Sequence, residues 1–351
     1  MIDVFKMHSL GKYIYEVMKY QRRKAAMKQR ILSVILAVGL LASLCVGCSS
    51  GSGDEGKEDA KEESKYPEKE ITMIIPWSAG GSTDTVSRKL ASVMEKELGQ
   101  SIVVQNTEGA GGNVGFSAIA QAKPDGYTIG IVSGTIILND YFMDDSVPYD
   151  SLYNLAIFCE NPSCIAVPAD SEFETLDDFL AYAKENPGKL QVANAGIGST
   201  WHGVACTLEN KAGVEFKHVP YDGGNPAVTA AAGGHVDAVV CAISEASTLV
   251  DSGNLRFLAT SSESVLSPDA PTFEECGVEG MFGAYNEVVA PKDIPEDVAQ
   301  RLLDAVQKAY DSEDMEKFMN DGGFGRLWIT GDELDQYLKD MDEAFSKIPT
   351  E

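Results

Sequence analysis

The sequence predicts an α/β protein of two lobes with a cleft between them, and two observations carry this prediction. Residues 71–132 alternate strand-like and helix-like segments in the order βαβαβ, which indicates a parallel sheet with helices on its faces. A second series of the same style begins near Val167. The chain has 351 residues, of which 44% are hydrophobic, so it can build two such units around substantial cores.

The first series opens with an apolar run at 71–75 that has the length of a buried strand. Residues 85–98 then repeat apolar side chains at helical spacing, which predicts a helix with one buried face. The positions on that face are Val86, Leu90, Val93, Met94 and Leu98. The series continues with a strand at 101–105, a short helix at 116–122 and a strand at 127–132.

The second series begins with a helix that starts at a capping box in residues 175–178 and runs to Glu185. Further strands are predicted at 190–194, 215–219, 236–241 and 257–260, and helices at 201–212 and 226–232. From about Ile294 onward we expect only helices, with one at 295–310 and a last one capped by Thr330.

The charge of the chain limits its partners. Acidic residues outnumber basic ones by 54 to 28, and the formal net charge is -26. A nucleic-acid partner requires patches of Lys and Arg, so this composition excludes that class. A small anion is still a suitable ligand, because backbone N–H groups can attract it locally.

The N-terminus predicts a lipoprotein. A short basic segment precedes an apolar run at 31–44, and the sequence Leu-Cys-Val-Gly-Cys follows. This pattern is typical of a secretory signal that ends in a lipoprotein cleavage box, with the lipid on Cys48. We expect residues 1–48 to be leader and signal peptide, with Met27 as the true start, and residues 49–65 to be a flexible charged tether. The alternative is an uncleaved membrane anchor; either way the body of the protein would be extracytoplasmic and attached to the cell membrane.

Five cysteines remain after the predicted cleavage and lipidation, and an odd number argues against a full disulfide framework. They are Cys159, Cys164, Cys206, Cys241 and Cys276. The sequence leaves two alternatives open: a local bridge between Cys159 and Cys164, or five free thiols.

Three glycine-rich turns, at 78–81, 109–115 and 195–200, each stand between a strand and a helix. Ligands of α/β sheets bind at the carboxyl ends of strands, so all three turns would face one cleft. Each turn offers the N–H groups of a helix start, and a hydrogen bond to a charged group contributes about 1.5–3 kcal/mol. Such turns could hold a carboxylate without Lys or Arg. The alternative is that the glycines only make tight turns.

Four further residues have two interpretations each. Trp77 and Trp201 flank glycine turns, and each would pack either on the carbon skeleton of a ligand or beneath its loop. Asp84 lies in a first helical turn, where it either complements the helix dipole or accepts a hydrogen bond from a ligand or a water. Asp237 would either brace the cleft or touch the ligand.

The sequence gives little support for catalysis, and we expect neither a catalytic residue nor a cofactor. The turn at 109–115 nearly matches the dinucleotide fingerprint GxGxxG, but its last spacing is wrong and no acidic residue follows at the required distance. Ser199 and His202 could be a nucleophile and its base, but no partner carboxylate is evident. His218 and His235 are dispersed along the chain, and no metal-ligand spacing appears.

Several motifs occur in one order along the chain: PWSAGGSTD from Pro76, GAGGNVG from Gly109, PDGY from Pro124, AGIGSTWH from Ala195, VPYDGG from Val219 and GGHVD from Gly233. In this order they resemble the Bug/TctC family, the extracytoplasmic receptors of tripartite tricarboxylate transporters. The likeness covers residues 66 to about 345. The chain departs from the family in lacking a Trp at 283–289 and in its lipoprotein signal, since many members are soluble periplasmic proteins.

The resemblance implies a periplasmic-binding-protein fold of type II, the Venus flytrap, with a mixed sheet flanked by helices in each lobe and two crossing strands. It places residues 66–165 in lobe 1 and 166–283 in lobe 2, with a return to lobe 1 at 284–351. It implies a monomer that holds a small organic carboxylate by turn amides, hydroxyls and ordered waters. The receptor would pass this ligand to a permease of large and small membrane subunits.

The ligand contacts implied by position in these motifs are Trp77, Gly81, Ser82, Thr83, Gly112, Asn113, Ser199, Thr200 and His202, with Tyr221 and Asp237 as weaker candidates and Asp84 added for its place in the first turn. Two alternative functions stay open. One is a sensory carboxylate-binding protein of the same fold that signals to a membrane partner, and the other is a surface hydrolase that uses Ser199 and His202.

Overall fold

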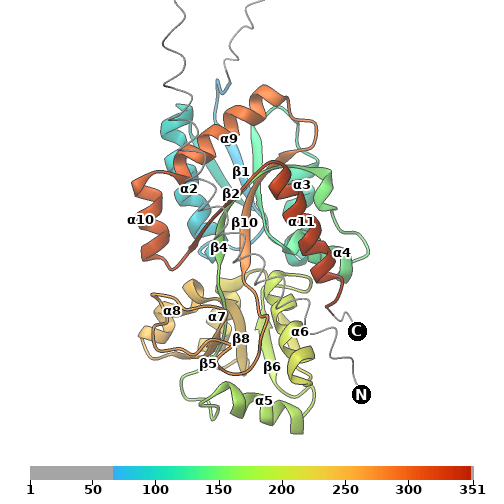
Figure 1. The fold of residues 1–351 in the computed structure, drawn as a ribbon, viewed down its shortest axis with the longest axis vertical. Helices are drawn as coiled ribbons and strands as arrows, with labels where there is room; N and C mark the ends of the chain where they lie inside the picture. The colour runs from blue at the N-terminus through green and yellow to red at the C-terminus, as the bar shows by residue number, and fades with distance from the viewer. Residues whose placement is uncertain (1–65, 349–351) are drawn as a thin grey trace, which may run out of the picture. The chain divides into compact units, whose positions relative to one another are not determined.

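The computed structural model describes residues 66–348, which form two α/β lobes (Figure 1). Each lobe has one sheet of mixed strand direction flanked by helices, which confirms the predicted fold class. The predictions for the leader, for lipidation at Cys48 and for the tether at 49–65 lie outside the described residues.

Lobe 1 contains, within the described part of the chain, a six-stranded sheet in the order β11-β4-β10-β3-β1-β2. Its strands are β1 (Ile71–Ile75), β2 (Ile102–Asn106), β3 (Thr128–Val132), β4 (Leu152–Asn161), β10 (Ala284–Pro291) and β11 (Gly325–Ile329). Its helices are α2 (Ser82–Leu98), α3 (Asn113–Ala120), α4 (Thr135–Phe142), α9 (Glu296–Tyr310), α10 (Glu313–Asp321) and α11 (Asp332–Phe345). Strands β1, β2 and β3 are parallel, as their βαβαβ order predicts, whereas β10 and β11 run antiparallel to their neighbours.

The predicted apolar face of α2 lies in the core of lobe 1. All five of its predicted positions are buried, and they pack in one cluster with the apolar side chains of β1 and β3. The helix ends at Gly99, whose φ of 69° is in the left-handed region that favours glycine. The sequence therefore fixes both the buried face and the end of this helix, and its beginning points toward lobe 2.

Lobe 2 contains, in the described residues, a five-stranded sheet in the order β7-β6-β8-β5-β9. Its strands are β5 (Ser163–Pro168), β6 (Gln191–Asn194), β7 (Lys217–Pro220), β8 (Ala238–Ala242) and β9 (Leu255–Thr260). Its helices are α5 (Leu176–Glu185), α6 (Thr200–Ala212), α7 (Gly224–Ala232) and α8 (Ile243–Asp251). The predicted capping box is present at the start of α5, where Thr175 and Asp178 bond each other's backbone N–H groups.

The chain crosses between the lobes at two adjacent points. It leaves lobe 1 at Pro162, between β4 and β5, and returns at Gly283, just before β10. A Cβ on Gly283 would lie 2.3 Å from the carbonyl oxygen of Asn161, so only glycine fits where the two crossings meet. The boundaries expected from the resemblance, after residue 165 and at 284, stay predictions.

Two expectations about the C-terminal region are wrong. Residues after 294 are not all helical, because β11 forms the edge of the lobe 1 sheet. Thr330 does not cap α11: its hydroxyl donates to the carbonyl oxygen of Leu155 at 2.8 Å, and Gly331 is the N-cap residue instead. The local pattern predicted that the Thr330 hydroxyl caps the helix, but this hydroxyl bonds instead to Leu155, which lies in strand β4 far away in the chain.

The five cysteines of the described residues are free thiols. Cys159 and Cys164 lie in different strands, β4 and β5, on either side of the crossing at Pro162. No helix within residues 66–348 is both long enough and apolar enough to cross a membrane.

Candidate functional site

A small cavity between the two lobes is the candidate site, with a volume of about 30 Å³. Its walls come from the start of α2 and the turn before it, the β3–α4 turn, and the start of α6 and the turn before it, with one residue each from α7, α8 and β10. Of the predicted contacts, Trp77, Gly81, Ser82, Thr83, Asp84, Ser199 and Thr200 line it. No Lys or Arg is among the described residues that line this cavity, so its attraction for an anion comes from helix starts and hydroxyls.

The start of α2 is one wall of the cavity and has no side-chain cap of its own. Its N-cap residue is Gly81, and the N–H of Ser82 donates at 2.9 Å to Oε1 of Glu245, which belongs to α8 in the other lobe. Among the hydrogen bonds of residues 66–348, none uses the N–H of Thr83 or of Asp84. These two groups carry the positive end of the helix dipole toward the cavity.

Asp84 holds the turn before α2 in shape. Its Oδ2 accepts the N–H of Gly80 at 2.9 Å, and its carboxylate also accepts from Arg88 and Asn106. Burial raises the pKa of this carboxyl, but the hydrogen bonds from Arg88, Gly80 and Asn106 outweigh that effect and hold the pKa below its ordinary value. The carboxylate is therefore already engaged within lobe 1, although it borders the cavity.

The start of α6 is the opposite wall, and its own side chain caps it. The hydroxyl of Ser199 accepts the N–H of His202 at 3.2 Å. The N–H of Thr200 donates at 2.9 Å to the hydroxyl oxygen of Thr135 in lobe 1, and the two threonine hydroxyls lie 3.0 Å apart. Ser133 donates to the same oxygen of Thr135 at 3.0 Å, so a chain of three hydroxyls crosses the cleft.

Three residues of the cavity wall were not predicted from the sequence: Ser133, Thr135 and Glu245. The first two stand in a Ser-Gly-Thr turn directly after β3, which is a small-residue turn like the three that were recognised. Glu245 had no local signal as a site residue, because it acts across the cleft on a helix 163 residues away in the chain. Trp77 and Trp201 both line the cavity, and Trp77 also packs edge-on against Phe116.

Two of the glycine turns touch each other. A Cβ on Gly111 would lie 2.3 Å from the carbonyl oxygen of Ile197, and a Cβ on Gly196 would lie 3.0 Å from the Cα of Gly111. Both glycines have positive φ, 57° and 112°. The turn at 109–115 thus contributes to the approach of the lobes and not to the cavity wall.

Gly112 and Asn113 are predicted contacts that do not line the cavity. A Cβ on Gly112 would lie 3.2 Å from the indole nitrogen of Trp77, so this glycine leaves room for the tryptophan. The amide of Asn113 donates to the carbonyl oxygen of Asp145 at 2.8 Å and accepts from the N–H of Val147 at 3.0 Å. These contacts hold the loop that follows α4.

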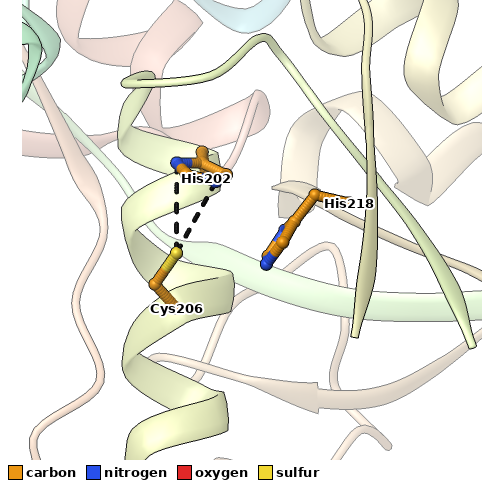
Figure 2. A group of neighbouring side chains, drawn as sticks. All are labelled: His202, Cys206 and His218. Carbon is orange, nitrogen blue, oxygen red and sulfur yellow. Dashed lines mark hydrogen bonds between the residues drawn. The ribbon is translucent and has the colours of Figure 1, made fainter. Parts of the chain in front are cut away.

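His202 lies behind its turn, in a cluster with Cys206 and His218 that Figure 2 shows. Its Nδ1 accepts the N–H of Gly198 at 3.3 Å, which leaves the ring proton on Nε2, 3.6 Å from the sulfur of Cys206. Burial, and next the neighbouring His218, lower the pKa of His202 to about 3, so its imidazole is neutral at physiological pH. His202 thus supports the cavity turn from behind instead of lining the cavity.

His202 and His218 are separated along the chain, but the fold brings their rings to 4.6 Å from each other. Nε2 of His218 pairs with the carboxylate of Glu209 at 3.0 Å. Two imidazoles and a thiol are potential ligands for a soft metal ion. Here, however, the bond from Gly198 keeps a proton on the nitrogen of His202 that faces the thiol, and such a nitrogen has no lone pair for a metal.

Tyr221 and Asp237 lie away from the cavity wall. The N–H of Tyr221 donates to the carbonyl oxygen of Asn194, which extends the pairing of β6 and β7. Asp237 precedes β8, and its Oδ2 accepts the N–H of Gln191 at 2.7 Å, at the amino ends of two parallel strands. The cavity lies at the carboxyl ends of these strands, so Asp237 braces the opposite edge of the sheet.

Comparisons with known proteins agree with this architecture. Residues 86–348 match the model of the tripartite tricarboxylate transporter family receptor. A UPF0065 protein of Pseudomonas sp. strain P51 is 31% identical over 319 residues, which are 89% of this chain and 93% of that protein. The periplasmic binding protein BugD has a similar structure, with a TM-score of 0.76 and 29% identity over 80% of this chain and 97% of BugD.

A third similar structure is MatC from Rhodopseudomonas palustris with bound malate, with a TM-score of 0.75 and 27% identity over 81% of this chain and 99% of MatC. The family match covers most of the chain, and these structures share its two-lobed fold over nearly their whole length. The chain therefore belongs to the tripartite tricarboxylate transporter receptor family, the solute-binding receptors of the Bug and TctC type.

Proposed function

We propose that this protein captures a small organic carboxylate in the cavity between its lobes and delivers it to a tripartite tricarboxylate-type transporter. The observation that carries the proposal is the composition of the cavity wall. The start of α2 and the Ser133–Thr135–Thr200 hydroxyls converge there, and no cationic side chain lines it. An uncapped helix start with free N–H groups favours an anion, and hydroxyls donate to carboxylate oxygens in a fixed geometry.

The relatives support the class of ligand. MatC, which is similar over nearly its whole length, is described with bound malate, a small dicarboxylate. In the present chain the hydroxyl of Ser78 also lies at the cavity, and it is buried without a hydrogen-bond partner among residues 66–348. A buried hydroxyl without a partner is costly, and a carboxylate oxygen in the cavity would satisfy it.

A thermal-shift screen of the purified protein tests the proposal. The panel comprises mono-, di- and tricarboxylates, aromatic acids and amino acids, with sugars and nucleotides as controls. A ligand that binds only the folded state stabilises that state by about 2.7 kcal/mol when its concentration is 100 times its Kd. The melting temperature therefore rises. Shifts confined to carboxylates support the proposal, and a shift only with a sugar or a nucleotide contradicts it.

We also propose that the protein acts outside the cytoplasm, with a lipid on Cys48, as a monomer that serves a permease of large and small subunits. The membership in a receptor family of transporters supports the partner, and the cleavage-box pattern supports the lipid. Cys48→Ser should release the protein from the membrane fraction and lower uptake of the ligand by cells. Unchanged membrane retention of this variant would contradict lipidation.

A further inference from the structure

One acidic side chain at the cavity has a role that the general features of the site do not explain. Glu245 reaches across the cleft from α8, and its Oε1 accepts the N–H of Ser82 at 2.9 Å. Its Oε2 accepts the N–H of Ala242, at the start of its own helix, also at 2.9 Å. A carboxylate of the protein thus occupies one of the N–H groups at the start of α2 that a ligand carboxylate would otherwise use.

Two glycines leave room for this carboxylate. A Cβ on Gly224, the first residue of α7, would lie 2.2 Å from Oε1 of Glu245, and a Cβ on Gly81 would lie 3.2 Å from the same atom. The starts of α2, α7 and α8 therefore surround the group. Burial raises the pKa of the Glu245 carboxyl, whereas the N–H groups of Ser82 and Ala242 oppose this effect because they donate to the ionised form. The position of the carboxylate is defined by backbone on several sides.

Glu245 has no cationic partner among residues 66–348. Asp84 also borders the cavity, but it forms an ion pair with Arg88 at 2.9 Å. None of the salt bridges within residues 66–348 includes Glu245. Each of its oxygens accepts one N–H and, with two lone pairs, can accept another donor from the cavity.

The cavity therefore has two chemically different ends. The hydroxyls of Ser133, Thr135 and Thr200 and the N–H groups of Thr83 and Asp84 suit one carboxylate. Burial already disfavours the charged form of Glu245, and a second ionised carboxylate beside it would add repulsion that is stronger here than in water, so the two acidic groups could not both ionise without a cost in free energy. An ammonium or an amide N–H would instead donate to the free lone pairs of Glu245.

We propose that Glu245 selects ligands that carry one carboxylate and one N–H donor, that is, amino acids or acid amides, over dicarboxylates of the same length. This inference rests on the proposed function, since it assumes that the ligand enters this cavity with a carboxylate. It assigns to Glu245 the recognition of the second polar group of the ligand.

The experiment compares matched ligands that differ in one terminal group. Calorimetric titrations of the purified full-length protein would use succinate, succinamate and β-alanine, and then glutarate, glutaramate and 4-aminobutyrate. We expect the best amide or amine of each series to bind at least about tenfold tighter than the dicarboxylate, which is about 1.4 kcal/mol. The wild-type preference decides the direction of selection even where a variant does not fold.

Glu245→Gln then tests the residue. The amide keeps the size of the side chain and one oxygen that accepts the N–H of Ser82, but it cannot ionise. We expect the preference to fall to about threefold or less. Glu185→Gln, on the exposed face of α5, makes the same substitution away from the cavity and should keep the wild-type preference. A preference that survives Glu245→Gln overturns the inference.

The outcomes separate this inference from the proposed function. A wild-type protein that favours succinate or glutarate is still a carboxylate receptor, but Glu245 then does not select for nitrogen. If the protein binds no compound of either series and no other carboxylate in the thermal-shift screen, both the proposed function and the inference fail.

Discussion

The two helix starts that face each other across the cavity, those of α2 and α6, come from similar sequences and are completed in different ways. Both follow a strand and a turn of Gly, Ser and Ala. At α6 the hydroxyl of Ser199 caps the helix, and His202 takes the N–H of Gly198 from behind. At α2 the N-cap is Gly81, without a side-chain bond, and the N–H of Ser82 is taken by Glu245 of the other lobe.

This difference predicts that the α6 start contributes mainly to folding and the α2 start mainly to ligand binding. The turn before α6 takes its cap from its own segment, so the capped geometry should persist when the lobes part, although the N–H of Thr200 bonds across the cleft to Thr135. The start of α2 is complete only when the lobes meet or when a ligand supplies an acceptor. Substitutions at α6 should therefore act mainly on folding, whereas substitutions at contacts between the lobes should act mainly on ligand binding.

The largest effect is expected where the lobes approach most closely. In Gly111→Ala the new methyl group would lie 2.3 Å from the carbonyl oxygen of Ile197 and keep the lobes apart. Overpacking of this kind costs about 1–3 kcal/mol, so the Kd of the ligand should rise by up to about 100-fold. Titration calorimetry with a ligand from the screen measures the change.

Gly99→Ala is the control for Gly111→Ala. Gly99 also has positive φ, at 69°, but nothing lies within 4 Å of its Cβ position. Both variants should lose about 1 kcal/mol of folding free energy from backbone strain. If Gly99→Ala weakens binding as much as Gly111→Ala does, the contact between the two turns is not what closes the cavity.

The second prediction concerns the pH dependence of folding at the α6 turn. The pKa of His202 is about 3 in the folded protein, below the ordinary value of 6.5 for an unfolded chain. The unfolded state thus binds a proton more readily, and the stabilising contribution of the neutral ring, complete above pH 6.5, is lost as the pH falls toward 3. At pH 5 the loss should be about 2 kcal/mol.

His202→Gln should remove this part of the pH dependence, since glutamine does not titrate. Urea unfolding of both proteins between pH 5 and pH 7.5 gives the two slopes of free energy against pH. A variant that loses stability with acid as steeply as the wild type would show that the pKa of His202 is not depressed.

The third prediction returns to the contacts between the lobes. Thr135→Val removes the hydroxyl that accepts the N–H of Thr200, and it leaves that donor without a partner in the closed protein. An unpaired buried donor costs about 1–3 kcal/mol, so the Kd should rise about tenfold with little change in folding. Thr207→Val is the control, because Thr207 donates at 2.8 Å to Gly203 within α6 itself. An equal loss of affinity in both variants would contradict a specific role for the bond across the cleft.

The sequence predicted the parts of the fold that depend on local pattern. The buried face of α2, the capping box of α5 and the parallel order of β1, β2 and β3 follow from spacing and from short-range capping chemistry. The glycine turns at 78–81 and 195–200 were recognisable for the same reason, since a helix start after a glycine turn is visible in a few residues. Both turns border the cavity.

The sequence could not predict hydrogen-bond partners that lie far apart along the chain. Thr330 has a cap-like sequence, but the structure gives its hydroxyl to Leu155, on a strand that the local pattern does not reveal. Asn113 lies in a glycine turn, but its amide is used by the loop after α4. Glu245 is typical of a first helical turn, and only the packing of the two lobes brings it to α2.

The smallest effect is expected from Ser199, and it is the sharpest test of the comparison between the two helix starts. Ser199 borders the cavity, so a direct ligand contact would make Ser199→Ala mainly a binding mutation. Its hydroxyl, however, already accepts the N–H of His202 at 3.2 Å. We therefore expect the loss of a helix cap, about 1 kcal/mol of folding free energy, and a Kd within about threefold of the wild type. Ser312→Ala, which removes the equivalent cap of α10, should cost about the same in urea unfolding. A tenfold loss of affinity in Ser199→Ala alone would show that the α6 start, like that of α2, is completed by the ligand.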